Sequence, residues 1–261
     1  MRDFIKAVIN LTPLTADAWR YWRVYPNNVA ACRGVYRSWE EAQAAAATEH
    51  RIRKRTDVLT YRAPEGVAIH PLAERDYPVL LHLAPLLRPG LRILNPGGSL
   101  AKEYASYRSL LPFPDGLDWR IREVPEVVEA GRAMLAAGDF PGLSFTTELA
   151  GAPDVFLICG ALQYLRPGLA EALQSLERLP PHVFVSRSPM MRGAATFWTV
   201  QNIGSAAVPY RIENEDSFLA EMAALGYRLV DGWRDQRRLA IPFFPDGTVT
   251  GYLGAYFSRA G

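Results

Sequence analysis

From residue 76 onward, short apolar runs alternate with stretches in which apolar residues recur at helical spacing. The apolar runs predict strands over 92–94, 118–124, 143–149, 154–160 and 182–187. Helical spacing predicts helices over 77–87, 99–111, 125–137, 169–179 and 215–225. Two long strand patterns, 227–238 and 249–259, flank proline and Asp-Gly turn residues and predict an antiparallel hairpin. The alternation predicts an α/β fold.

The first 75 residues have a different pattern, with apolar residues scattered among arginines. Ser38 followed by Glu41 predicts a helix start, and the helix is expected to continue through an alanine run toward Arg55. We therefore expect a helical N-terminal extension over 1–75 and an α/β domain over 76–261. Within that domain, residues 190–211 are expected to form a loop-rich insert.

Composition narrows the function classes. Apolar residues make up 49% and charged residues 21%, as in ordinary globular proteins, and the net charge of +2 argues against a nucleic-acid partner. Cys32 and Cys159 are too few for a disulfide scaffold and predict reduced thiols in a cytoplasmic protein. No apolar run is long enough to predict a membrane span.

Candidate chemistry lies where the predicted strands end, because ligands of open α/β sheets bind beyond the carboxyl ends of strands. The first feature is the glycine turn Asn95-Pro-Gly-Gly-Ser99, where backbone can approach a ligand closely. The second is Glu123, whose two oxygens suit both hydroxyls of a ribose. Simple turn chemistry and a solvated helix-capping carboxylate are the structural alternatives.

Two further strand ends carry candidates. Gly160-Ala-Leu-Gln-Tyr164 follows the most buried strand, and its small residues leave room for a flat ring. Arg187 emerges where it could hold an anionic substrate group. Core packing of Tyr164 and a surface ion pair of Arg187 are the alternatives. Together, the order of these features indicates a class I S-adenosylmethionine-dependent methyltransferase, since the three spaced glycines of nicotinamide enzymes are missing.

The chain also resembles a family of bacterial methyltransferases often encoded beside surface-polysaccharide or other biosynthetic genes. The matching segments are Gly34-Val-Tyr-Arg-Ser-Trp-Glu-Glu-Ala42, Gly97-Gly-Ser-Leu100, Leu162-Gln-Tyr-Leu165, Arg187 with Pro189, and Thr199-Val-Gln201. The resemblance implies a doubly wound, seven-stranded Rossmann-like methyltransferase sheet that ends in an antiparallel hairpin. It also implies S-adenosylmethionine as cofactor and a small-molecule substrate, such as a sugar or natural-product intermediate.

The resemblance further implies roles by position. Gly97, Gly98 and Ser99 line the methionine end of the cofactor, and Asn95 accepts a hydrogen bond from its ammonium. The remaining cofactor contacts are Glu123 at the ribose, with Gly160, Ala161 and Leu162 around the adenosine. Residues expected to face the substrate are Tyr36, Tyr104, Tyr164, Arg187 and Gln201.

Four positions depart from the family pattern. Asn95 replaces an acidic residue, Pro96 an apolar one and Ala101 a glycine, while Ser186 stands where an acidic residue often precedes the arginine. These departures leave two other functions open. One is a methyltransferase-fold protein that uses the cofactor for a cyclisation or rearrangement, and the other is a non-catalytic binding partner.

Methyl transfer mainly requires alignment of nucleophile, methyl and sulfur, and the four dispersed histidines predict no metal site. Candidates for the catalytic groups are His70, Tyr104 and Arg187, with His50 as a further candidate base. The N-terminal segment is either a lid over the substrate or a brace on the sheet, and it could also form the contact of a homodimer.

Overall fold

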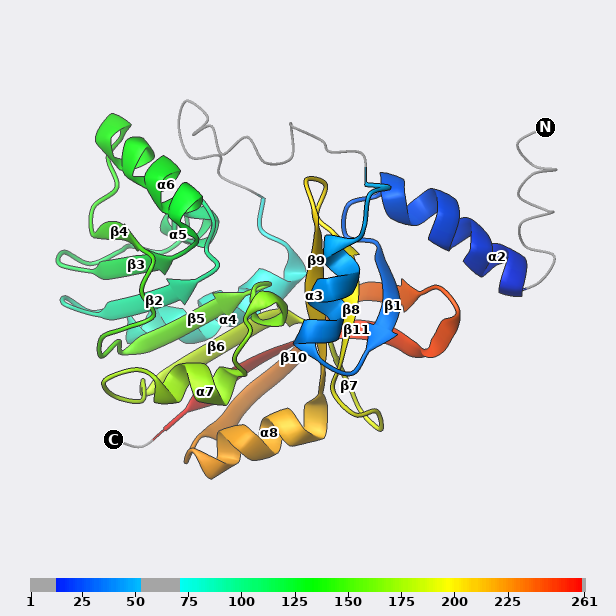
Figure 1. Cartoon of the computed structure of the whole chain (residues 1–261). Helices are drawn as coiled ribbons and strands as arrows, with labels where there is room; N and C mark the ends of the chain where they lie inside the picture. Colours follow the sequence, from blue (N-terminus) through cyan, green and yellow to red (C-terminus); the bar gives the residue numbers. More distant parts are fainter. Residues whose placement is uncertain (1–12, 53–70, 260–261) are drawn as a thin grey trace. The chain divides into compact units, whose positions relative to one another are not determined.

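The computed structural model describes residues 13–52 and 71–259, which form two compact units (Figure 1). The first unit combines the N-terminal segment with residues 189–215 and 236–251. The second contains the described part of residues 61–188 together with 216–235 and the C-terminal segment that starts at Tyr252. The second unit carries the α/β sheet, and the first has a smaller sheet of its own.

A seven-stranded sheet has the order β10-β11-β6-β5-β2-β3-β4, and all of it except residues 236–251 of the β10–β11 hairpin belongs to the second unit. Its parallel strands are β2 (Arg92–Pro96), β3 (Asp118–Arg122), β4 (Leu143–Thr146), β5 (Val155–Cys159) and β6 (His182–Ser188). β11 (Phe244–Ser258) pairs antiparallel with β6, and β10 (Arg228–Ile241) lies beside β11. This sheet confirms the predicted fold class, including the terminal hairpin.

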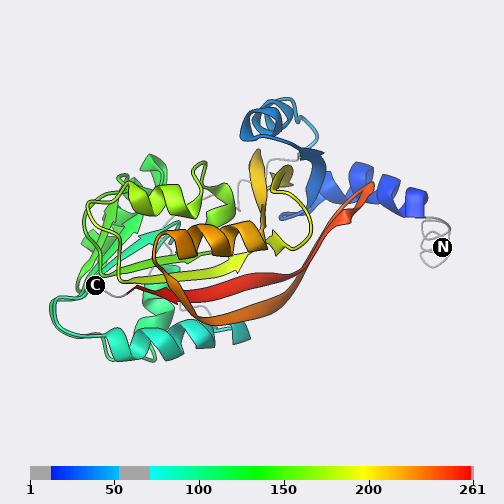
Figure 2. The ribbon, with the colours of Figure 1, turned by 90° about the horizontal axis from the view of Figure 1, so that it is seen from below.

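Helices cover both faces of this sheet. α4 (Tyr77–Leu83), α5 (Lys102–Arg108) and α6 (Pro125–Ala137) share one hydrophobic core with inward-facing residues of the parallel strands. α7 (Leu169–Gln174) and α8 (Glu215–Ala224) lie on the other face, where Phe218 contacts Phe257 edge to ring (Figure 2). Short helical turns sit at η3 (Glu74–Asp76), η4 (Ala84–Leu86) and η5 (Leu162–Tyr164). The carboxyl ends of β2, β3, β5 and β6 are followed by loops.

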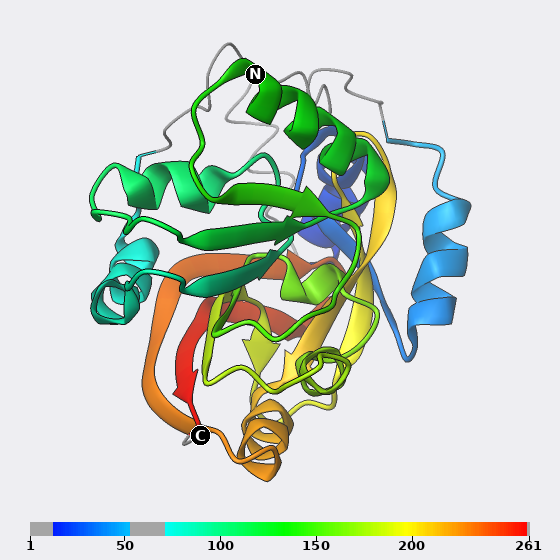
Figure 3. The ribbon, with the colours of Figure 1, turned by 90° about the vertical axis from the view of Figure 1, so that its left-hand side faces the viewer.

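One connection of the sheet is unusually short. β4 ends at Thr146 and β5 begins at Val155, so residues 147–154 cross past β3 and β2 without a helix (Figure 3). Parallel crossovers generally need a dozen or more residues and contain a helix. Part of one sheet face is therefore left without a helix, and Asp118, Arg120 and Arg122 alternate along β3 with buried Trp119 and Ile121.

The first unit contains α2 (Pro13–Trp19), the turns η1 (Arg20–Val24) and η2 (Tyr25–Asn27), and α3 (Trp39–Ala47). Its sheet has the order β1-β8-β9-β7, built from β1 (Cys32–Tyr36), β7 (Met190–Met191), β8 (Phe197–Asn202) and β9 (Ala207–Asn214). The expectation of a loop-rich insert over 190–211 is thus wrong. β-Branched and aromatic residues in this insert form a hairpin, although Gly193, Gly204 and Pro209 suggest loops.

The start of α3 agrees with its sequence signature. Ser38 Oγ accepts a hydrogen bond from Glu41 N at 3.2 Å, as the capping pattern predicts. The helix ends at Ala47 and does not continue toward Arg55. In β1, Gly34 has φ +71° at a register shift in the pairing with β8. A Cβ there would lie 2.5 Å from the Tyr36 hydroxyl, which explains the glycine of the Gly-Val-Tyr segment.

Candidate functional site

The glycine turn after β2 forms a tight bend against the end of β5. Gly97, Ser99 and Ala101 all have positive φ, at +73°, +50° and +61°. A Cβ on Gly97 would lie 2.1 Å from the Ala161 Cβ, so the turn has no room for a side chain at this point. Ala101 keeps the left-handed backbone that a glycine adopts easily, at a position where the family pattern has glycine. Strained backbone of this kind concentrates at functional sites.

Glu123 closes the other side of this turn. Its Oε1 accepts a hydrogen bond from Ser99 N at 2.9 Å, and its Oε2 accepts one from Val124 N at 3.2 Å. A carboxylate has about four lone-pair positions, so both oxygens keep acceptor capacity for hydroxyl groups. Four of the predicted cofactor residues, Gly97, Ser99, Glu123 and Ala161, therefore lie around one turn.

Asn95 lies beneath the turn and is 1% exposed. Its Nδ2 donates to the Leu157 carbonyl at 2.8 Å, and its Oδ1 accepts from Trp119 Nε1 at 3.3 Å. A Cβ on Gly98 would lie 2.5 Å from that same oxygen. The side chain thus links β2, β3 and β5, and only one lone pair of Oδ1 remains for the predicted cofactor ammonium. That contact stays a prediction.

Arg187 forms an ion pair inside the second unit. The register between β6 and β11 shifts between Val185 and Ser188, and Arg187 there has φ +59°. Such a bulge re-aims a side chain. The guanidinium of Arg187 pairs with the Glu103 carboxylate of α5 and donates to the Cys159 carbonyl at 2.6 Å. Both side chains are nearly buried, so the predicted contact with an anionic substrate group has no geometric support here.

The electrostatics of this pair follow from its burial. Burial raises the pKa of Glu103, and the neighbouring Arg187 opposes that rise without cancelling it. A Cβ on Gly160 would lie 3.2 Å from Arg187 Nε, so the arginine also packs against the exit of β5. The pair therefore joins α5, β5 and β6 at the carboxyl end of the sheet.

Lys102 is a nearby residue that is not among the site residues predicted from the sequence. It opens α5 directly after the glycine turn and is partly buried. Burial lowers the pKa of its ammonium, and the charge of Arg187 lowers it further. The available sequence signal was its place next to the turn, in a chain that has only three lysines.

The remaining predicted residues lie elsewhere. Tyr104 donates its hydroxyl to the Pro141 carbonyl at 2.9 Å and packs its ring against Phe113 and Trp119, so its role as a base has no geometric support. Leu162 is buried beside the end of β5, while Tyr164 is 37% exposed. His70 lies outside the described residues.

Two predicted substrate residues, Tyr36 and Gln201, belong to the first unit. The Gln201 side chain is 4% exposed, and its Nε2 donates to the Ala30 carbonyl at 3.4 Å. Tyr36 lies on β1, with its hydroxyl beside Gly34. Their contact with a substrate stays a prediction.

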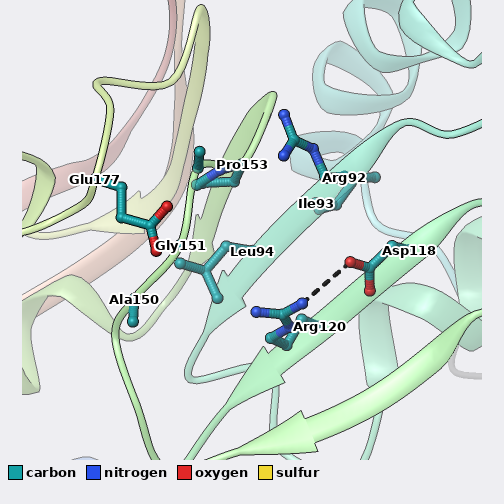
Figure 4. Close-up of a pocket in the computed structure, with 10 residues that line it drawn as sticks. Arg92, Ile93, Leu94, Asp118, Arg120, Ala150, Gly151, Pro153 and Glu177 are labelled. Atoms are coloured by element: carbon teal, nitrogen blue, oxygen red, sulfur yellow. Dashed lines mark hydrogen bonds and ion pairs between the residues drawn. The ribbon is translucent and has the colours of Figure 1, made fainter.

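A pocket of about 210 Å³ lies at the opposite end of the large sheet, near the amino ends of β2 and β3 (Figure 4). Its walls include the 150–153 segment of the short crossover, with Arg120 and Glu177 at its sides. Arg120 is bonded to Asp118 through Nη2 at 3.2 Å. This pocket is separate from the glycine turn, which lies at the carboxyl end of β2.

Among residues 13–52 and 71–259, no cluster of histidine, cysteine or carboxylate side chains could hold a metal ion. In that same part of the chain, no helix combines the length and apolar character needed to cross a bilayer.

No protein-family model and no curated protein matches the chain, so the predicted bacterial family is not confirmed. Several solved structures match. An S-adenosylmethionine-dependent methyltransferase from Mesorhizobium loti is 15% identical, covers 72% of this chain and 99% of its own, and has a TM-score of 0.47. The 1,6-didemethyltoxoflavin-N1-methyltransferase of Burkholderia thailandensis is 16% identical over 74% of this chain and 94% of its own, with a TM-score of 0.44.

A third match is the mitomycin 7-O-methyltransferase MmcR, which is 18% identical with a TM-score of 0.40. That match covers 66% of this chain and 49% of the other, so the chain spans about half the length of that protein.

Proposed function

We propose that the second unit binds S-adenosylmethionine and transfers its methyl group to an oxygen or nitrogen of a small molecule. The observation that carries this proposal is the closed turn, in which Ala161 leaves no room for a side chain at Gly97 and Ser99 N donates a hydrogen bond to Glu123. The turn lies at the point in the strand order where β2 has β3 on one side and β5 on the other. Open α/β sheets bind their ligands at such a switch point.

The residues present fit this cofactor. The side-chain-free cradle at Gly97 and Gly98 allows close backbone approach, and the Glu123 oxygens can accept from two ribose hydroxyls. Gly160, Ala161 and Leu162 would flank the adenosine at the end of β5. When bound, the cofactor supplies an activated methyl group, and the protein's task is to align the acceptor and exclude water.

Calorimetry with S-adenosylmethionine and S-adenosylhomocysteine tests this function. We expect both ligands to bind the wild-type chain and Gly97→Val to bind at least about tenfold more weakly, because its side chain would occupy the space of Ala161. Gly168→Ala is the matched control, since a Cβ there meets no atom within 4 Å. The proposal fails if the wild-type chain gives no binding heat at millimolar ligand.

A second candidate function is a cofactor-assisted cyclisation or rearrangement that leaves the methyl group in place. Asn95 motivates it, because a buried neutral amide bonded to Leu157 and Trp119 stands where the family pattern has a carboxylate. Mass spectrometry of molecules that co-purify with the chain separates the two functions. A methylated small molecule with S-adenosylhomocysteine supports transfer, whereas intact S-adenosylmethionine with an isomerised product supports the second candidate.

The cellular setting is part of the same proposal. We expect a cytoplasmic protein that acts on a small molecule, with homodimer formation to be tested by light scattering. A non-catalytic partner role predicts a stable complex with another protein and no turnover of S-adenosylmethionine.

A further inference from the structure

Lys102 is the basic residue next to the proposed cofactor turn. It follows Ala101, whose backbone ends the turn with φ +61°, and it is the first residue of α5. It is the single lysine in the described part of the chain, since Lys6 and Lys54 lie outside it. Its position places an amine at the carboxyl end of the sheet.

The charged groups around Lys102 come from three elements. Arg187 of β6 and Arg75 of η3 are positive, while Glu103 of α5 and Asp76 of η3 are negative. Glu103 is paired with Arg187, and Asp76 Oδ2 accepts a hydrogen bond from Ala73 N at 2.9 Å. Within the described residues, no carboxylate lies within ion-pair distance of the Lys102 ammonium.

An amine in this setting loses its proton more easily than an exposed one. Burial lowers the pKa of Lys102 most, and the like charge of Arg187 acts in the same direction. Glu103 and Asp76 oppose this shift, but they do not cancel it. A lysine with a lowered pKa is a suitable general base near neutral pH.

Other titratable groups of the second unit are less suited to take a proton at this place. Burial raises the pKa of the Cys159 thiol to about 12 and that of the Tyr107 hydroxyl well above its usual value, and both are buried. The Glu123 carboxylate already accepts hydrogen bonds from two backbone N–H groups. His182 lies at the start of β6, at the far end of that strand from Arg187.

We propose that Lys102 takes the proton that the acceptor loses during methyl transfer, an inference that rests on the proposed function. The lone pair of the acceptor's oxygen or nitrogen forms the bond to the methyl carbon. The bond between that carbon and sulfur breaks, and its electron pair goes to sulfur. The proton of the acceptor's O–H or N–H moves to Lys102 Nζ, so the neutral amine becomes an ammonium.

Competitive labelling with acetic anhydride tests the first requirement without any acceptor. The three lysines fall in separable peptides, so mass spectrometry follows each amine across pH 7–11 against added N-acetyl-lysine amide. We expect Lys102 to titrate at a lower pH than this free amine, because burial and the charge of Arg187 lower its pKa. A midpoint at or above that of the free amine overturns the proposal, because a lysine that holds an anion would be shifted upward.

Two variants tie the shift to the residues around Lys102. Asp76→Asn removes a negative charge yet keeps an oxygen that can accept from Ala73 N, so the Lys102 midpoint should move further down. Asp139→Asn, on a carboxylate whose side chain is 90% exposed, is the control and should leave the midpoint unchanged. An unchanged midpoint in Asp76→Asn contradicts the assigned surroundings.

Turnover tests the second requirement, which is that Lys102 takes the acceptor's proton during methyl transfer. S-adenosylhomocysteine release is measured with a fractionated small-molecule metabolite extract as the acceptor pool. Lys102→Arg and Lys102→Met should both lose at least about 100-fold in rate, with S-adenosylhomocysteine affinity unchanged by calorimetry. Full activity in Lys102→Arg overturns the proposal, since arginine keeps the charge but cannot take the proton. Failure of the wild-type chain to bind either cofactor form refutes the methyltransferase proposal instead, and the labelling result still decides the state of Lys102.

Discussion

The Arg187 guanidinium of β6 forms an ion pair with the Glu103 carboxylate of α5, and both side chains are almost fully buried. The same guanidinium donates to the Cys159 carbonyl at 2.6 Å. One arginine therefore holds the helix that follows the glycine turn against the ends of β5 and β6. An arginine bound in this way links α5 to the ends of β5 and β6, and its contact with a substrate stays a prediction.

Removal of one partner of this pair should destabilise the second unit strongly. Arg187→Met leaves Glu103 buried without its cation, and such losses cost about 3–5 kcal/mol. The double variant Arg187→Met with Glu103→Met should recover most of that loss, because no charge is left buried. Urea unfolding measures both variants. Arg120→Met, which breaks a half-exposed pair with Asp118, is the control and should cost less than about 1 kcal/mol.

The cost of Arg187→Met should depend on pH. The pKa of Glu103 is already raised in the folded state, and loss of Arg187 raises it further. A carboxyl with a raised folded pKa destabilises the fold increasingly as pH climbs through that pKa, and it is harmless below the pKa of the unfolded chain. The difference between Arg187→Met and wild type should therefore shrink on acidification. A pH-independent difference would show that packing and not charge dominates.

Asn95→Asp restores the residue type of the family pattern, yet it should weaken the fold. An aspartate cannot donate to the Leu157 carbonyl, and its charge would be buried at a position that is 1% exposed. We expect a loss of about 2 kcal/mol or more at pH 7 by thermal unfolding, decreasing toward acidic pH. Asn28→Asp, where an exposed amide donates to the Val24 carbonyl, serves as the control and should change stability little. Equal effects in both variants would contradict a special role for the buried amide.

Both cysteines should resist alkylation in the folded protein. Burial raises the pKa of Cys32 and of Cys159 to about 12, so little thiolate is present at pH 8. Iodoacetamide should label both much more slowly than free cysteine, and labelling should become fast in urea. Peptide mass spectrometry gives each rate separately. Rapid labelling of folded Cys159 would show that the end of β5 opens readily.

Asp154 should contribute to the loss of stability at acidic pH. Burial alone would raise the pKa of Asp154, but hydrogen bonds from Arg92 and the charges of Arg92 and Arg88 outweigh it and lower that pKa. A lowered folded pKa stabilises the fold above the unfolded pKa, and this contribution is lost as pH falls through the folded pKa. Asp154→Asn should therefore flatten the decline in melting temperature below about pH 4. If the melting temperature of the variant declines as steeply as that of the wild type, other carboxylates cause the loss of stability at acidic pH.

Local sequence determined the features that depend on neighbours in the chain. The alternation of apolar runs predicts the α/β sheet and its terminal hairpin, and Ser38 with Glu41 predicts the start of α3, because period and capping are local properties. The glycine turn is predicted for the same reason. Its role in the proposed site needs the contact with Ala161, which lies more than sixty residues later.

Only the tertiary structure decided what the polar residues near that turn do. A bulge in β6, which depends on pairing with β11, turns Arg187 toward Glu103. Asn95 is hydrogen-bonded to Leu157 and Trp119, and Tyr104 to Pro141, through contacts between distant segments. Lys102 gains its lowered pKa from burial and from Arg187. Hydrogen bonding, burial and charge are set by residues far apart in the chain, and sequence periodicity carries no record of them.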